Sequence, residues 1–525
     1  MKRVLSLFIA CLMALSVVAE IVDIRKPRLV VFITIDGLKS DHFYRLYDRF
    51  SDGGFKKIID DGCFWDNVEF NYISKNPVVD IASICTSTTP KRHGIISDKL
   101  YSDKTHDFYS IIEDKGSKGI YCSVGRSPRN LQSTTFSDML KLAYPQSKVI
   151  SIGLNPEKTI VMAGHNPDGV VWIDSEVSLA SSDYYKQMPI WATEFNASGL
   201  INNYLKSVWR PMKPMHQYMF LPYNDKNGAF YSPDTSKDSK YLMERFLFTP
   251  YANSAVNQLA QQAIKREKLG QGSQTDILCL NYNVNTFFNQ SSELNTAEKE
   301  DLYLSLDRDI SILLRVIAEE IKMDNALIVF AGTQTEPFSQ NTLNKNNMPT
   351  GRFDAKRYMA LLNSFLMARY GQARWVLNYA DGNVFLNHKE IDRKNVDRKK
   401  LLHSAIEFLS SIDGINTVVS VDDISGAVGD IHNVNVRLNQ SVSKKRSGDL
   451  ILVFSEGWVD VDIDGVESSI SSSALQRTPV AFYGLNIKSK RISQRYFVTD
   501  IASTICHIMQ ISSPSSSIGE IMSIR

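Results

Sequence analysis

The chain has 525 residues, and its 59 basic residues nearly balance its 57 acidic ones. With 43% hydrophobic and 22% charged residues, the composition is that of a globular protein. It excludes a disordered chain, a collagen-like fibre and a multi-span membrane protein. The near-neutral charge also argues against a nucleic-acid binder that depends on a broad basic surface.

The N-terminus has the pattern of a secretory signal peptide over residues 1–19. Lys2 and Arg3 precede an apolar run over residues 4–18, and Ala19 supplies a small residue at a cleavage point. The run is short for a membrane-spanning helix. We therefore expect export to the periplasm, the cell surface or the medium, with no membrane span after cleavage. Cleavage leaves 57 basic against 57 acidic residues, so charge indicates no particular partner.

The remaining chain alternates between buried-strand and helical patterns. Continuous apolar runs predict strands at residues 28–36, 148–154, 276–281 and 326–331. Helical patterns lie at residues 44–60, 136–142, 254–268 and 298–322. This alternation predicts an α/β fold with a mainly parallel central sheet and helices on both faces. Two segments that break the rhythm, residues 196–248 and 335–447, are predicted to be inserted caps.

Five cysteines remain after residue 19, and their number is odd. They are Cys63, Cys85, Cys122, Cys279 and Cys506. In an exported protein a disulfide is possible, but at least one thiol must stay free or pair outside the chain. Several of the five lie in apolar runs, which favours buried small hydrophobic residues.

Several motifs, in order along residues 28–520, resemble the alkaline phosphatase superfamily. The strand ending at Asp36-Gly37 resembles the opening strand of its phosphodiesterase/nucleotide pyrophosphatase branch. The segments at residues 83–96 and 478–484 resemble those that follow the nucleophile and the last metal ligand of secreted bacterial alkaline phosphatases. The resemblance implies an alkaline phosphatase-like α/β domain over 28–520, two zinc ions and hydrolysis of phosphate esters.

The resemblance also implies where the zinc ligands should stand, and most of these positions carry other residues. Asp36 alone keeps a ligand-type side chain. The Asp and His positions of the other strands read Asn281, Asn285, Gly332, Thr333 and Arg477. Neutral amides bind zinc much more poorly than carboxylate or imidazole. We therefore expect no metal cofactor, and we consider an ion pair between Arg477 and Asp36 in its place.

The nucleophile and phosphate-binding positions differ in the same way. The position of the nucleophilic Thr is occupied by Pro77, which has no hydroxyl, and Ser74 would serve only with a shifted alignment. The phosphate-holding Asn is replaced by Asp98, and the Lys-x-Arg pair by Asn155 and Glu157. The carboxylates at two of these positions would repel a phosphate.

The remaining candidates are weaker. None of the nine histidines has the carboxylate spacing of a zinc site, and we interpret His93 and His165 as turn-packing residues and Asp41-His42 as a solvated helix start. Residues 444–448, Lys-Lys-Arg-Ser-Gly, are interpreted as a solvated turn and not a nucleic-acid patch.

The sequence thus leads to two hypotheses. The first is an exported, catalytically inactive member of the superfamily that binds an unidentified protein or small molecule, or acts as a scaffold, without nucleic acid. The second is an active metal-dependent phosphomonoesterase or phosphodiesterase with a non-standard site, in which Ser74 could be the nucleophile.

Overall fold

The computed structural model describes residues 25–174, 178–223, 230, 242–286, 293–333, 340–424, 426, 429–465, 467–468 and 473–524. The predicted signal peptide lies outside this part of the chain. In the described residues no helix has the length and apolar character needed to cross a membrane.

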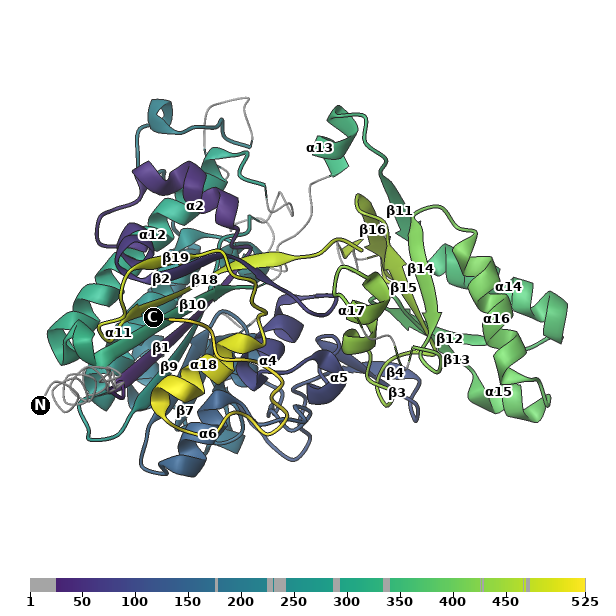
Figure 1. Cartoon of the computed structure of the whole chain (residues 1–525), viewed down its shortest axis with the longest axis horizontal. Helices are drawn as coiled ribbons and strands as arrows, with labels where there is room; N and C mark the ends of the chain where they lie inside the picture. Colours follow the sequence, from purple (N-terminus) through teal and green to yellow (C-terminus); the bar gives the residue numbers. More distant parts are fainter. Residues whose placement is uncertain are drawn as a thin grey trace, which may run out of the picture.

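A ten-stranded mixed sheet forms the centre of the molecule (Figure 1). The five adjacent strands at its centre run parallel to one another and are β10, β1, β9, β6 and β7. The strands on either side of them, β18 and β8, run antiparallel to their neighbours. In spatial order the strands are β19 (Lys490–Ile492), β2 (Cys63–Glu69), β18 (Arg477–Gly484), β10 (Ala326–Gly332), β1 (Leu29–Asp36), β9 (Asp276–Asn283), β6 (Val149–Gly153), β7 (Gly169–Ile173), β8 (Leu179–Ser182) and β5 (Gly119–Ile120). The prediction of a mainly parallel α/β sheet with its four buried strands is confirmed.

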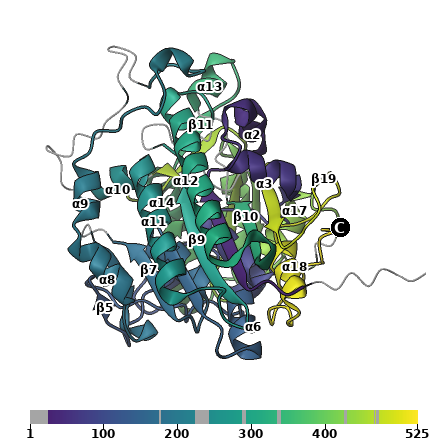
Figure 2. The same ribbon diagram turned by 90° about the vertical axis from the view of Figure 1, so that its left-hand side faces the viewer.

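Helices cover both faces of this sheet because its central strands are apolar on both sides. On β1, Val31 and Ile33 face one core, and Val30 and Phe32 face the other. The first core contains α2 (Ser40–Leu46), α3 (Phe55–Asp61), α8 (Ile190–Ala197), α9 (Leu200–Leu205), α10 (Leu242–Leu247), α11 (Pro250–Glu267) and α12 (Ala297–Ile321), of which α11 and α12 lie in front in Figure 2. The second contains α4 (Pro77–Thr86), α6 (Phe136–Ala143), α7 (Pro156–Ala163) and α18 (Asp500–Met509).

The helical pattern predicted over residues 44–60 is divided in the structure. The chain turns between α2 and α3, and the side chain of Asp307 accepts hydrogen bonds from the backbone N–H groups of Ser51 and Phe55 at 2.7 Å each. At Gly54, a Cβ atom would lie 2.1 Å from Asp307 Oδ1. The close approach of α12 therefore leaves no room for a side chain at Gly54, directly before α3.

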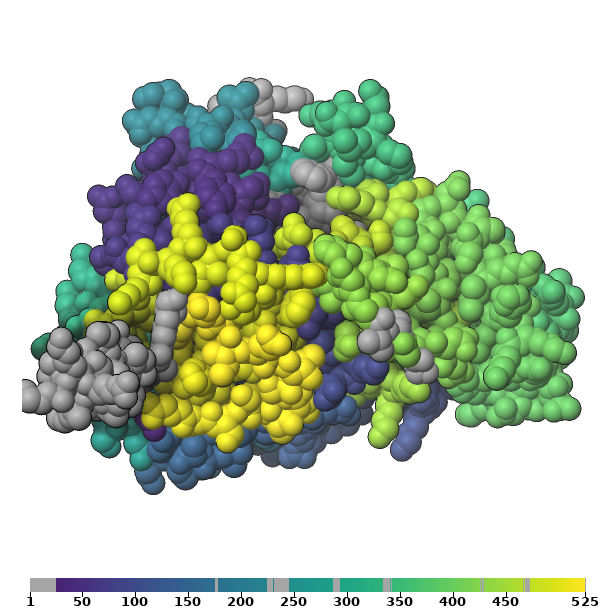
Figure 3. Space-filling model, viewed as in Figure 1, coloured from purple at the N-terminus to yellow at the C-terminus, as the bar shows by residue number. Residues whose placement is uncertain are grey.

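A second lobe projects beside the central sheet (Figures 1 and 3). A four-stranded sheet contains β12 (Val376–Ala380), β13 (Asn383–Leu386), β15 (Leu450–Phe454) and β14 (Ile415–Ser420), and a three-stranded sheet contains β11 (Gly351–Asp354), β16 (Trp458–Val461) and β17 (Glu467–Ser468). The helices of this part are α13 (Gln340–Lys345), α14 (Ala355–Tyr370), α15 (His388–Arg393), α16 (Arg398–Ser410) and α17 (Val434–Ser441). Its hydrophobic core is separate from those of the large sheet. We propose that residues 335–447, whose described part lies in this lobe, and residues 196–248 are cap insertions, although β15, β16 and β17 of the lobe follow residue 447.

The hairpin of β3 (Lys99–Ser102) and β4 (Asp107–Ser110) lies with α5 (Pro90–His93) near the second lobe (Figure 1). Tyr101 of this hairpin stacks on Phe385 of β13, with ring centroids 4.1 Å apart. The hairpin therefore joins the body that carries the large sheet to the four-stranded sheet of the lobe.

The cysteines form no disulfide with one another. All five that follow residue 19 are free, and all but the half-buried Cys122 are buried. Burial raises the pKa of Cys279 and of Cys506 to about 12. These thiols thus act as small core residues, as their apolar surroundings in the sequence indicate.

Candidate functional site

The carboxyl ends of β1, β9 and β10 meet at one edge of the large sheet. Because β1 pairs in parallel with both neighbours, Thr34 lies beside Asn281, and Ile35 lies beside Gly332. Asp36 follows as the last residue of β1 and is only 2% exposed. Side chains that follow central strands at such an edge form the usual binding crevice of an open α/β sheet.

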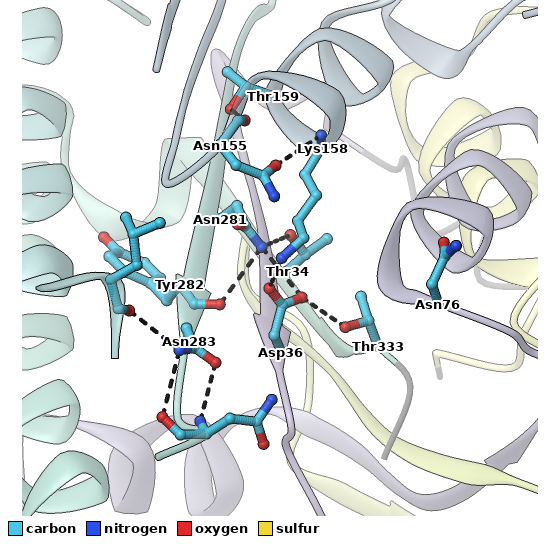
Figure 4. A network of polar contacts seen from close by, with 12 residues as sticks. Thr34, Asp36, Asn76, Asn155, Lys158, Thr159, Asn281, Tyr282, Asn283 and Thr333 are labelled. Atoms are coloured by element: carbon cyan, nitrogen blue, oxygen red, sulfur yellow. Dashed lines mark hydrogen bonds and ion pairs between the residues drawn. The ribbon is translucent and has the colours of Figure 1, made fainter. Parts of the chain in front are cut away.

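Asp36 has three partners, all of which are hydrogen-bond donors or cations (Figure 4). Its Oδ2 forms an ion pair with the ammonium group of Lys158. Its Oδ1 accepts a hydrogen bond from Thr333 Oγ1 at 2.7 Å and a longer one from Asn281 Nδ2 at 3.4 Å. Hydrogen bonds from two neutral groups and an ammonium satisfy this buried carboxylate.

Lys158 reaches Asp36 because of how α7 begins. The Asn155 side chain caps this helix by accepting the backbone N–H of Lys158 at 3.1 Å, and Pro156 occupies the first helical position. The Thr159 carbonyl accepts a hydrogen bond from Ser151 Oγ of β6 at 2.8 Å, which fixes the first turn of α7 against the sheet. The side chain of Lys158 is only 15% exposed, so its charge is directed inward.

The groups around Asp36 do not suit a zinc ion. Zinc requires ligand atoms with free lone pairs, usually from thiolate, imidazole or carboxylate. Lys158 and Asn281 instead present N–H groups to Asp36, and Thr333 donates its hydroxyl hydrogen. Among the described residues, no group of three or more His, Cys, Asp or Glu side chains converges. We therefore assign no chemical step to a metal at this site.

Two further predicted positions lie close to Asp36 without contacting it. Asn285 packs against the glycine that follows Asp36: a Cβ atom at Gly37 would lie 2.0 Å from Asn285 Oδ1. That oxygen accepts a hydrogen bond from Lys299 at 3.3 Å. Gly332 ends β10, where a Cβ would lie 2.3 Å from Thr478 Oγ1, so a side chain has no room there.

The predicted nucleophile and phosphate-binding positions have structural partners of their own. Pro77 is the first residue of α4, and the preceding Asn76 caps that helix. Asp98 accepts a hydrogen bond from Ser97 at 3.0 Å. Glu157 forms an ion pair with Arg126, its nearest nitrogen at 3.5 Å.

The predicted ion pair between Arg477 and Asp36 is wrong. Arg477 lies directly opposite Glu69 in the antiparallel register of β18 and β2. Its guanidinium binds Glu69 at 3.1 Å, and Arg495 binds the same carboxylate at 2.6 Å. Cross-strand neighbours of opposite charge pair readily, and the cation that neutralises Asp36 is Lys158 instead.

Ser74, the alternative nucleophile, is 1% exposed and donates a hydrogen bond to Asp80 Oδ2 at 2.8 Å. Tyr72 donates to the other oxygen of the same carboxylate at 2.9 Å. Asp80 thus holds both hydroxyl groups in the interior at the start of α4.

The histidines that we predicted to be packing residues form hydrogen bonds inside the fold. His93 is buried and lies 2.9 Å from Ser83 Oγ, and burial lowers its pKa to about 3. His165 Nδ1 lies 2.8 Å from Asp138, beside the start of α6. The prediction of a solvated Asp41-His42 pair is wrong for His42, which is 1% exposed and bonds Tyr303 at 2.7 Å.

A family model described as type I phosphodiesterase / nucleotide pyrophosphatase matches residues 30–466. The chain belongs to this family. A relative named alkaline phosphatase PhoV from Synechococcus elongatus is 28% identical, with 95% of this chain and 93% of the relative covered. A relative named calcium-transporting ATPase from Myroides odoratus is also 28% identical, with 97% and 96% covered.

Solved structures place the chain in the alkaline phosphatase superfamily. The crystal structure of wild-type alkaline phosphatase PafA has a TM-score of 0.86 and 26% identity, and the match covers 95% of this chain and 99% of that one. The alkaline phosphatase-like fold predicted from the motifs is thereby confirmed. Lys158 was not among the predicted site residues. The helix start at Asn155-Pro156, directly after a predicted strand, is the signal that places this lysine in a first helical turn at the strand ends.

Proposed function

We propose that this chain is an exported, catalytically inactive member of the alkaline phosphatase superfamily with a binding or scaffolding role. The observation that carries the proposal is the ion pair of Lys158 with Asp36. Asp36 is the only acidic residue at the positions that the resemblance marks as zinc ligands. The internal cation Lys158 already balances its charge, so the Asp36 carboxylate is not free to attract a metal.

The surrounding side chains support the same conclusion. At the other positions marked as ligands, Asn281 and Thr333 donate hydrogen bonds to Asp36, and Arg477 binds Glu69. Pro77 at the start of α4 supplies no hydroxyl for a covalent intermediate. The side chains of Asn281, Thr333 and Arg477 thus already form contacts in the folded state that metal binding or catalysis would have to break.

Metal analysis and activity assays on one preparation of the purified protein test this proposal. We expect no stoichiometric zinc, and we expect turnover of p-nitrophenyl phosphate and bis-p-nitrophenyl phosphate by the wild type and by the matched Asp36→Asn variant to be no higher than in a protein-free blank. The Asp36→Asn variant is the control because it removes the remaining ligand-type group while it keeps the size of the side chain. Stoichiometric zinc together with turnover that Asp36→Asn abolishes would overturn the proposal.

The alternative is an active hydrolase with a non-standard site. Two relatives that are named alkaline phosphatases favour this alternative. Ser74 is then the candidate nucleophile, with Asp80 as its hydrogen-bond acceptor. Turnover that survives in Asp36→Asn and is lost in Ser74→Ala would establish this alternative. If Ser74→Ala keeps both its zinc and its turnover, Ser74 is excluded as the nucleophile.

Export is part of the same proposal. It rests on the signal-peptide pattern of residues 1–19. Fractionation of cells that produce the full chain, with mass measurement of its N-terminus, tests it. We expect the protein in the periplasm or medium and cleaved after Ala19; an intact N-terminus in the cytoplasm would contradict export.

A further inference from the structure

A cavity of about 380 Å³ lies where the β3–β4 hairpin meets the second lobe. Its walls come from the hairpin, from the segment joining β13 to α15, from the start of α16 and from the turn between α17 and β15. None of its lining residues belongs to the Asp36 network. Its volume is in the range of small-molecule sites and is too small for a folded partner.

Aromatic rings give this cavity a fixed wall. Tyr101 stacks on Phe385, and Phe108 packs edge-on against Phe385 with centroids 5.7 Å apart. The hydroxyl of Tyr101 lies 3.1 Å from His106 Nδ1. Because these rings pack against one another, the cavity is formed before any ligand enters.

Four of the lining charges are balanced among themselves, and we call them the inner layer because they surround the buried Asp449: Asp449, His388, Arg398 and Asp422. The side chain of Asp449 is 7% exposed and binds His388 Nε2 at 2.6 Å and Arg398 at 2.7 Å. Arg398 also forms an ion pair with Asp422. Two carboxylates thus hold one guanidinium and one imidazole in place, and this inner layer presents no excess charge when His388 is protonated.

The rim has an excess of positive charge. Lys389, Lys444 and Lys445 line the cavity and are exposed, and within the described chain no carboxylate forms an ion pair with any of them. Arg446 donates hydrogen bonds to the carbonyls of Gly94 and Asn130 at 2.7 Å, which fixes its position without neutralising its charge. Asp103 and the half-exposed Asp422 also line the cavity, and Asp422 is paired with Arg398.

From this arrangement we propose that the cavity binds a compact ligand with two phosphate-type groups. Once Asp422 and Asp449 are set against Arg398 and a protonated His388, four further cations and one further carboxylate, Asp103, line the cavity. This local excess of positive charge suits an anion of more than one charge. The whole chain is nearly neutral and the cavity is small, which favours a small molecule over a nucleic acid or another extended polyanion. The turn over residues 444–448, interpreted from the sequence as solvated, then supplies part of a binding site.

Calorimetric titration of the full protein with methylenediphosphonate tests this proposal. The P–C–P bridge of this probe resists hydrolysis, so the result does not depend on whether the Asp36 site is active. We expect saturable binding of one equivalent, and weaker binding of inorganic phosphate because it carries one group only. Affinity should fall as the salt concentration rises, because exposed charges are screened.

Matched double variants locate the site. Lys444→Gln with Lys445→Gln should weaken the affinity for methylenediphosphonate about tenfold, since two charge-assisted contacts are lost. Lys399→Gln with Lys400→Gln removes the same charge from exposed lysines next to Arg398 that do not line the cavity. We expect this control to change the affinity less than about twofold.

Two results would overturn the proposal. One is the absence of saturable binding of methylenediphosphonate at low salt concentration. The other is an equal loss of affinity in the two double variants, which would mean that the probe responds only to the overall charge. Because all four lysines are exposed, neither variant is expected to unfold the protein.

Discussion

At the carboxyl end of β1, the cation Lys158 is paired with a buried carboxylate, whereas no carboxylate among the described residues forms an ion pair with Lys389, Lys444 or Lys445 around the second-lobe cavity. The first region therefore has its charges satisfied within the fold. The second keeps an excess of positive charge that only a ligand or solvent ions can balance. In the described residues, the lysine at the edge where an α/β sheet commonly binds ligands is thus paired, and the excess of exposed lysines lies at the second-lobe cavity instead.

The largest test of this contrast is removal of the carboxylate that neutralises Lys158. Asp36→Ala should lower the free energy of unfolding by about 3 to 5 kcal/mol, because it leaves a largely buried ammonium without its partner. Asn281 and Thr333 would lose their acceptor as well. Urea unfolding followed by circular dichroism measures the change.

The double variant Asp36→Ala with Lys158→Met is the control for that experiment. It removes both charges, so we expect it to recover a large part of the lost stability. If the single and double variants are equally unstable, the loss of stability does not come from an unpaired Lys158 charge, and the contrast between the two regions fails.

The junction between the two regions offers a test of intermediate size. Asp460 of β16 is buried near Lys75, which precedes α4, and it accepts a hydrogen bond from Tyr379 at 2.7 Å. Burial raises the pKa of Asp460 to about 7. The folded state therefore loses stability as the pH rises from about 4 to about 7, where the carboxyl ionises more easily in the unfolded chain.

Asp460→Asn should remove this penalty. We expect the variant to gain roughly 2 to 4 kcal/mol relative to the wild type between about pH 4 and about pH 8, since each pKa unit corresponds to about 1.4 kcal/mol. Urea unfolding of both proteins across this pH range measures the difference. A constant difference would show that Asp460 does not titrate in this range. Asp464→Asn, a change of the same charge at an exposed position nearby, serves as the control.

The smallest test concerns His388 at the cavity. Its hydrogen bond to Asp449 raises the pKa of His388, and burial alone would raise the pKa of Asp449 but is outweighed by hydrogen bonds from His388 and Arg398. Stability from His388 is thus fully present below its unfolded pKa and is lost as the pH rises through its higher folded pKa. His388→Gln should cost less than about 1 kcal/mol at acidic pH and still less at alkaline pH, because the imidazole is largely exposed.

Unfolding curves of His388→Gln and the wild type at both ends of that pH range check the sign. A larger cost at alkaline pH would show that neutral His388 is the stabilising form, and the inner layer of the cavity would then carry less positive charge than we infer.

The central sheet could be predicted because its signals are local. Eight consecutive buried residues from Leu29 to Asp36 can hardly form anything but a strand covered on both faces, and this alone places Asp36 at the edge of the sheet. The partner of Asp36 could not be read in the same way. Arg477 was the wrong choice because the register that sets it opposite Glu69 depends on strand pairing far apart in the chain.

The cavity of the second lobe was beyond prediction for a similar reason. The lysines of the 444–448 turn are exposed, as the sequence indicated, but their meaning depends on Tyr101 and Arg398, which lie far from them in sequence. A turn with two adjacent lysines is ordinary by itself. It becomes a candidate site only because the fold places the aromatic ring of Tyr101 and the paired carboxylate of Asp449 next to it.

The two outer strands of the large sheet have a consequence for how this protein associates. β5 has two residues, and β19 has three, of which Lys490 and Arg491 are charged and exposed. Short, charged margins offer an incoming strand few free backbone groups and a repulsive surface. Self-association by extension of the large sheet is thereby discouraged at both of its margins.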